Sequence, residues 1–173
     1  MKLFGTTVAA LAAALLTAPA MAATGTVKIL GTAQGSSISG DLKMTETPNG
    51  LTVAGDVNGL TPGMHGFHIH DFGDCSDSGK AAGGHYNPKN NPHGNVLKDG
   101  QAHAHAGDMG NVEADSQGVA HINVTIPGMT LAGGKLSAAG RAVVVHEKAD
   151  DFGQPVGNAG GRVGCGTIVI TGN

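Results

Sequence analysis

Tryptophan is absent from the 173-residue sequence, which has one tyrosine and four phenylalanines. Because large aromatic side chains supply much of an ordinary core, this chain must build its core from aliphatic and small residues. Charged residues make up only 13% of the chain, and ten Lys and Arg against thirteen Asp and Glu give a net charge of −3. The basic residues form no clustered stripe, which argues against a nucleic-acid partner.

Long apolar runs are also lacking, except at the N-terminus. Residues 1–22 (MKLFGTTVAALAAALLTAPAMA) have one positive charge at Lys2, an Ala/Leu-rich middle, and small residues at Ala20 and Ala22. This pattern predicts a secretory signal peptide that is cut between Ala22 and Ala23. A membrane anchor is disfavoured because threonines interrupt the run and leave its apolar part too short to span a bilayer. We therefore expect residues 23–173 to form a single exported domain that has no membrane partner.

Cysteine is scarce, with Cys75 and Cys165 alone. The short Ala-rich leader favours the bacterial periplasm over a eukaryotic secretory route. In an exported chain, two cysteines imply one disulfide.

Glycine is abundant, with thirty residues, and indicates many turns and few long helices. Stretches with a period of two recur between these turns, for example in residues 51–57 after the Asn49-Gly50 turn signal and in residues 119–126. Together they predict an all-β fold of about eight strands with no convincing helix. Two long stretches, 71–108 and 147–163, break the rhythm, and we expect them to be functional loops.

Histidine is concentrated in residues 64–75 (MHGFHIHDFGDC). Strand geometry sends His68 and His70 to one face, and His65, Phe67 and Ile69 to the other. Further candidate ligands follow at His85, His93, His105, Asp108 and His146. Imidazole is the commonest protein metal ligand, and these side chains are numerous enough for two ions. One imidazole could bridge the ions through its two ring nitrogens.

Five blocks occur in order along the chain: HGFHIHDFGDC, GGHYNP, HAGDMGNV, VVVHEKADD and GNAGGRVGCG. Together they resemble copper/zinc superoxide dismutases, specifically those of the bacterial periplasm. The resemblance covers residues 23–173 almost entirely. It implies an eight-stranded antiparallel Greek-key β-sandwich, or flattened barrel, with two long functional loops. It also implies an oxidoreductase that converts two superoxide anions and two protons into dioxygen and hydrogen peroxide.

The resemblance implies two ligand sets that share His85. Copper would be held by His68, His70, His85 and His146, and zinc by His85, His93, His105 and Asp108. Asp150 resembles the carboxylate that links a copper-ligand imidazole to a zinc-ligand imidazole.

Catalysis in the family runs by one-electron cycling of copper. The resemblance implies that His85 carries a proton between the two half-reactions. Arg162 matches the arginine at the mouth of the copper site and would bind the superoxide anion. A Cys75–Cys165 bridge would tie the metal-bearing loop to the strand after Arg162.

Four histidine assignments have alternatives. His65 faces away from His68, so we expect a buried, hydrogen-bonded side chain, whereas His121 lies on a polar strand face and should be solvated. His103 competes with His105 for zinc, but the spacing to Asp108 favours His105. His93 is the least constrained ligand, because its flanking loop differs from that of many relatives.

Alternative functions are a periplasmic copper-binding or copper-sequestering module without catalysis, and a dinuclear metallohydrolase. The hydrolase would need an acidic residue where Phe72 stands. The stretch DFGQPVGNAGG is short and has no lysine, whereas the corresponding loop of longer family members carries charged residues credited with steering substrate. Lys80 or Lys89 is the expected substitute, with Lys148 a further candidate. The resemblance is also compatible with a homodimer.

Overall fold

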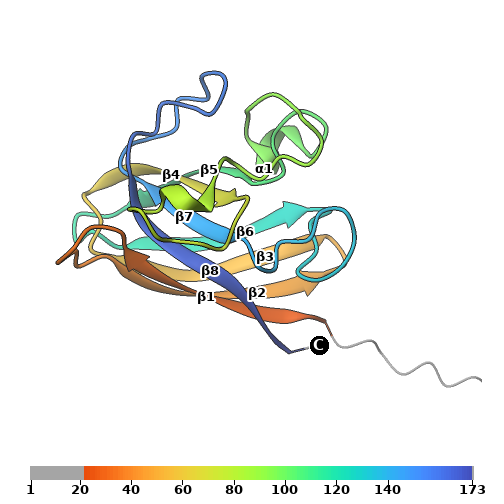
Figure 1. Ribbon diagram of the computed structural model, residues 1–173, viewed down its shortest axis with the longest axis horizontal. Coiled ribbons are helices and arrows are strands. Elements are labelled where there is room, and N and C mark those ends of the chain that lie inside the picture. The colour runs from red at the N-terminus through yellow and green to blue at the C-terminus, as the bar shows by residue number, and fades with distance from the viewer. Residues whose placement is uncertain (1–21, 173) are drawn as a thin grey trace, which may run out of the picture.

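A closed, antiparallel β-barrel forms the body of the protein in the computed structural model, which describes residues 22–172. The eight strands are β1 (Thr24–Gly31), β2 (Ser39–Thr47), β3 (Gly50–Asn58), β4 (Gly63–His70), β5 (Asp108–Ala114), β6 (Ala120–Pro127), β7 (Ala142–His146) and β8 (Arg162–Gly172). Around the barrel their order is β1-β2-β3-β6-β5-β4-β7-β8 (Figure 1). The all-β prediction and the number of strands are confirmed.

Alternating side chains fill the barrel. In β3, Leu51, Val53 and Val57 are buried while the residues between them reach the surface. In β4, Phe67 and Ile69 join the same aliphatic core, and Phe67 is the only phenylalanine among the fully buried side chains of the described residues. The core is therefore built as the composition predicts, from Val, Ile, Leu, Met and Ala.

The predicted Asn49-Gly50 turn lies one residue earlier than expected. Pro48 and Asn49 form the turn between β2 and β3, and Gly50 already pairs with Thr47 across the ladder. Gly50 has a φ of 137°, and a Cβ there would lie 2.0 Å from the Ile126 carbonyl oxygen. Glycine is thus required because the neighbouring strand passes so close.

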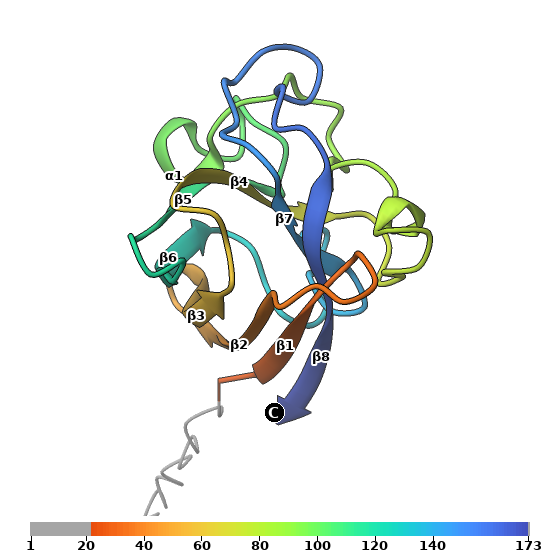
Figure 2. The same ribbon diagram turned by 90° about the vertical axis from the view of Figure 1, so that its left-hand side faces the viewer.

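Two loops project beyond one end of the barrel, where Figure 2 shows them above the strands. We name residues 71–107 the long loop and residues 147–161 the mouth loop. The long loop contains a 3-10 turn (Lys80–Ala82) and a one-turn helix, α1 (Val96–Asp99), which the sequence patterns did not predict. Asn95 caps α1, because its side-chain oxygen accepts the Leu97 amide. Among residues 22–172, no helix is long and apolar enough to cross a membrane.

Candidate metal centre

Four buried histidines converge where the long loop meets the barrel. His68 and His70 project from one face of β4, His146 ends β7, and His85 comes from the long loop, where it forms an isolated antiparallel bridge with His70. One ring nitrogen of each lies within 4.8 Å of the others. We name His68, His70, His85 and His146 the nitrogen cluster.

A second group shares His85 and adds a carboxylate. His85, His93, His105 and Asp108, the mixed cluster, also offer ligand atoms within 4.8 Å of one another, and all four are buried. Asp108 begins β5, and its Oδ1 lies 2.8 Å from Nδ1 of His85 and 3.2 Å from Nδ1 of His105. Its Oδ2 lies 2.8 Å from Nδ1 of His93, without hydrogen-bond alignment. Three Nδ1 atoms therefore surround one carboxylate.

Protons on the outer ring nitrogens leave inward-facing lone pairs. Nε2 of His68 lies 2.9 Å from Oδ2 of Asp150, so it must donate, and Nδ1 of His68 is left buried without a partner. Nδ1 of His70 donates to the Gly83 carbonyl at 3.0 Å, which leaves its Nε2 as an acceptor, 3.3 Å from Nε2 of His146. Buried nitrogens are rarely left unpartnered, so this arrangement fits a bound cation.

Asp150 of the mouth loop joins the two clusters. Its carboxylate accepts from Nε2 of His68 at 2.9 Å and from Nε2 of His93 at 2.9 and 3.0 Å. Asn111 of β5 holds the backbone of Asp150, since its Oδ1 accepts the Asp150 amide at 2.7 Å and its Nδ2 donates to the Asp150 carbonyl at 2.9 Å. One imidazole of each cluster is therefore fixed in tautomer and orientation by the same carboxylate.

Burial keeps three histidines of the nitrogen cluster neutral. Loss of solvation, reinforced by neighbouring imidazoles, lowers the pKa to about 4 for His68, about 2 for His70 and about 3 for His146. Neutral imidazoles keep their lone pairs available, as a metal ligand must.

Two carboxylates, Asp108 in the mixed cluster and Asp150 beside it, affect the pKa of His93. Burial opposes charge on His93, but the adjacent carboxylates of Asp108 and Asp150 raise its pKa to about 9. Burial also opposes charge on both aspartates. Hydrogen bonds from His105 and His85, together with the adjacent His93, nevertheless hold the pKa of Asp108 far below its usual range, and hydrogen bonds from His68 and His93 lower the pKa of Asp150. Asp108 is thus ionised and supplies the mixed cluster with a negative charge that suits a cation.

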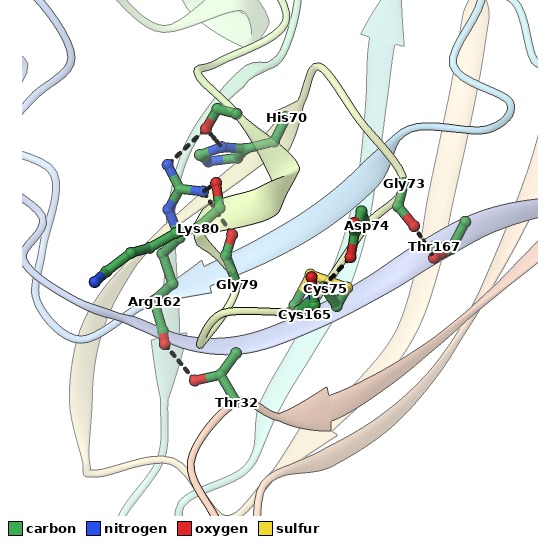
Figure 3. The surroundings of a disulfide bond; sticks show 12 residues. Thr32, His70, Gly73, Asp74, Cys75, Gly79, Lys80, Arg162, Cys165 and Thr167 are labelled. Carbon is green, nitrogen blue, oxygen red and sulfur yellow. Dashed lines mark hydrogen bonds between the residues drawn. A yellow bond between two sulfur atoms is a disulfide. The ribbon is translucent and has the colours of Figure 1, made fainter.

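Arg162 lies beside the nitrogen cluster at the start of β8. Its Nη1 donates to the carbonyls of Gly79 at 2.6 Å and Lys80 at 3.3 Å, and its Nη2 donates to that of Gly83 at 2.6 Å. Figure 3 shows Arg162 beside Gly79, Lys80 and His70. The Gly83 carbonyl accepts from both Arg162 and His70. A guanidinium has five N–H groups, so donors remain for a ligand. Arg162, His70, His85 and His146 line one cavity of about 240 Å³.

The disulfide predicted from the cysteine count is present between Cys75 of the long loop and Cys165 of β8 (Figure 3). Cys165 packs with Ala82, Ala142 and Val144 in a small apolar cluster. The loop segment that carries the Arg162 cradle is therefore covalently attached to the strand that carries Arg162.

The remaining histidines lie outside both clusters. Buried His65 bonds to the carbonyls of His146 and Thr61, while His121 is exposed and bonds to Asp56 at 2.7 Å. His103 is exposed, whereas His105 is buried in the mixed cluster. These positions agree with the expectations from strand alternation and from the spacing to Asp108.

Three lysines were candidates for steering. Lys80 borders a surface hollow that Arg162 also lines, and the Lys148 side chain lies beside Gly160 in the mouth loop. Lys89 instead points its Nζ toward the Gln101 carbonyl, at 3.4 Å.

Sequence reasoning did not find two residues that contact the loops around the clusters, Gln154 and Asn111. Their only signal in the sequence was an amide side chain near a ligand motif.

The sequence profile described as copper/zinc superoxide dismutase (SODC) matches residues 38–168. The chain belongs to the copper/zinc superoxide dismutase family. The family uses copper and zinc, and the two clusters have donor sets that suit them, with all-nitrogen ligation for copper and three imidazoles with a carboxylate for zinc.

Three family members illustrate the similarity. The Cu-Zn superoxide dismutase of Onchocerca volvulus is 44% identical over 124 residues, which is 66% of this chain and 76% of that protein. The Cu-Zn superoxide dismutase 3 of Arabidopsis thaliana is 46% identical over 119 residues, 65% of this chain and 70% of that protein. An extracellular Cu-Zn superoxide dismutase of Brugia pahangi is 42% identical over 125 residues, 66% of this chain and 61% of that protein.

Among solved structures, the crystal structure of the clock protein EA4 superposes with a TM-score of 0.76 at 34% identity. The match covers 91% of this chain and all of that one (100%).

Proposed function

We propose that this chain is a superoxide dismutase, with copper held by the nitrogen cluster and zinc by the mixed cluster. The reaction takes two superoxide anions and two protons to dioxygen and hydrogen peroxide. Family membership supports the activity. The observation that carries the proposal is the position of His85, which is the one residue common to both clusters.

Each ion would have a distinct role in the reaction. When bound, copper supplies one-electron cycling between Cu(II) and Cu(I), and zinc, which has no redox chemistry, supplies a fixed positive charge. Nδ1 of His85 faces Asp108, which leaves Nε2 of His85 for the nitrogen cluster. Nε2 of His85 is therefore the atom that can hold a proton and deliver it to the second superoxide.

Arg162 binds and orients the substrate. Arg162 lines the same cavity as His70, His85 and His146, so an anion there can receive charge-assisted hydrogen bonds from its remaining N–H groups. The cradle of backbone carbonyls holds the guanidinium in place before substrate arrives, which lowers the entropic cost of binding.

The decisive experiment measures superoxide decay with purified protein that carries both metals. The wild-type protein should act catalytically, and His85→Ala should lose activity while copper still binds to the three remaining histidines. A stoichiometric reaction that stops after one equivalent would instead indicate a copper-sequestering module. A dinuclear metallohydrolase would want carboxylates in both sites, and the nitrogen cluster has none.

The proposal includes export to the periplasm. The signal peptide falls on residues 1–22, of which 1–21 lie outside the described residues. The Brugia pahangi relative is named an extracellular enzyme, which supports export. N-terminal sequencing of the protein from a periplasmic extract should begin at Ala23.

The proposal also covers the steering residue and the assembly. Lys80 borders the same surface hollow as Arg162, which favours it over Lys89. The family resemblance is compatible with a homodimer, and sedimentation velocity on the metal-loaded protein measures the assembly directly.

A further inference from the structure

The mouth loop supplies one wall of the substrate cavity. Val156, Gly157, Ala159 and Gly160 line it together with the histidines and Arg162. Three of these four residues are glycine or alanine, so the width of the cavity depends on where the backbone of the loop lies. Contacts that fix this backbone therefore control which anions reach the nitrogen cluster.

The base of the mouth loop is held by the barrel end. Backbone pairs join Glu147 to Gly161 and Lys148 to Ala159. Asp150 is held by Asn111 and bonds to both clusters. These contacts secure both ends of the loop. Asn158 then closes the segment 151–158 by two bonds to the Asp151 carboxylate, but those bonds do not attach it to the long loop.

Gln154 provides that attachment. Its Oε1 accepts the backbone amide of His93 at 3.0 Å, and its Nε2 donates to the His93 carbonyl at 2.9 Å. The primary amide thus pairs with a backbone in the two-bond manner of a neighbouring strand. Of the described residues 151–160, Gln154 alone hydrogen-bonds through its side chain to the long loop.

Other residues of the mouth loop also pack closely against His93. A Cβ on Gly157, which has a φ of +68°, would lie 2.1 Å from Oδ1 of Asp150 and 3.0 Å from Nε2 of His93. The Phe152 ring stacks on the His93 ring with centroids 6.3 Å apart. His93 is therefore contacted by Phe152 and Gln154 and lies directly beneath Gly157.

We propose that Gln154 is a positioning residue that fixes the mouth loop to the backbone of His93 and thereby limits the substrate cavity to small anions. The proposal rests on the proposed function only for the identity of the ion beneath the cavity. Through Gln154, the position of His93 in the mixed cluster determines where the mouth loop lies, and the mouth loop in turn forms one wall of the cavity at the nitrogen cluster.

Hydrogen exchange on the metal-loaded protein tests the attachment without using superoxide. In Gln154→Ala, backbone amides of residues 151–160 should exchange roughly tenfold faster than in the wild type, because two hydrogen bonds no longer oppose local opening. Gln154→Glu keeps the acceptor for the His93 amide and loses the donor, so it should fall between the two. Gln117→Ala, an exposed glutamine in the β5–β6 turn, is the matched control and should leave the loop unchanged.

A spectroscopic measurement tests the effect on the cavity. Hexacyanoferrate(II), a bulky anionic reductant, should bleach the copper absorbance several times faster in Gln154→Ala than in the wild type. Azide, a small anion, should bind equally well to both. A role in stability alone would not separate the two anions.

Unchanged exchange in residues 151–160 of Gln154→Ala overturns the proposal. Faster exchange spread equally over the strands also overturns it, because Gln154 would then act on the whole fold. If Gln154→Ala fails to fold, Gln154→Glu carries the same two measurements. A wild-type protein that bound both metals without dismutating superoxide would refute the proposed function and leave the exchange result intact.

Discussion

Removing the disulfide should cost several kcal/mol of stability without abolishing the fold. The variant is Cys75→Ser/Cys165→Ser, which leaves no free thiol. The bond joins residues separated by 90 positions, so breaking it frees a large part of the unfolded chain. Chain-entropy arithmetic for a loop of that length predicts a loss of about 4–5 kcal/mol. Native domains have unfolding free energies of about 5–15 kcal/mol, so a folded protein should remain.

The assay is urea unfolding of the metal-loaded wild type and variant, with the wild type under a thiol reductant as a control. The reduced wild type should unfold at the midpoint of the variant. Because the bond lies next to the segment whose carbonyls hold Arg162, exchange of the Gly79 and Lys80 amides should also quicken in the variant. A loss below about 1 kcal/mol would refute the reasoning, since the unfolded chain would then gain little freedom from the break.

Three further predictions concern other surfaces. Lys80→Glu should slow superoxide decay about twofold to threefold at low ionic strength and flatten its salt dependence, while Lys89→Glu should change neither. A result in which the two variants behave alike would remove Lys80 from steering. Gly157→Ala should lower the unfolding free energy by about 1–3 kcal/mol, measured in urea, because its Cβ meets a buried carboxylate; an unchanged midpoint would contradict this. Asp56 raises the pKa of exposed His121 above 6.5, so an NMR titration of Asp56→Asn should return that pKa toward 6.5. Because the folded-state pKa is raised, the stabilisation that the pair gives should be present below pH 6.5 and lost as the pH rises through the folded-state pKa. A difference in unfolding free energy between wild type and Asp56→Asn that grows with pH would contradict the pairing.

Most of the correct sequence predictions came from the local spacing of side chains along the chain. Alternation in β4 separates His68 and His70 from Phe67 and Ile69, and the structure has this arrangement. The spacing between His105 and Asp108 likewise selects His105 over His103. These features depend on a few neighbouring residues, so the order of side chains along the chain is sufficient.

Contacts made by the backbone could not be predicted in this way. The Arg162 cradle consists of carbonyl groups, which every residue possesses, and its formation depends on how the long loop folds. Gln154 is exposed, and nothing in its neighbours points to His93, which lies 61 positions away. Helix α1 was missed because four residues are too few to establish a helical period.

The seam between β5 and β6 has a consequence for misfolding. Those two strands share a single registered pair, Ala114 with Ala120, whereas β3 and β6 share eight. If the barrel opens, it should open there, and β5 and β6 would then become unpaired edge strands capable of recruiting another copy into fibres. Because β5 begins at Asp108, which pairs with His68 of β4, an ion held by that carboxylate would fix β5 at the end opposite the weak joint. Removal of the metal should therefore loosen β5 and promote aggregation before the protein unfolds globally.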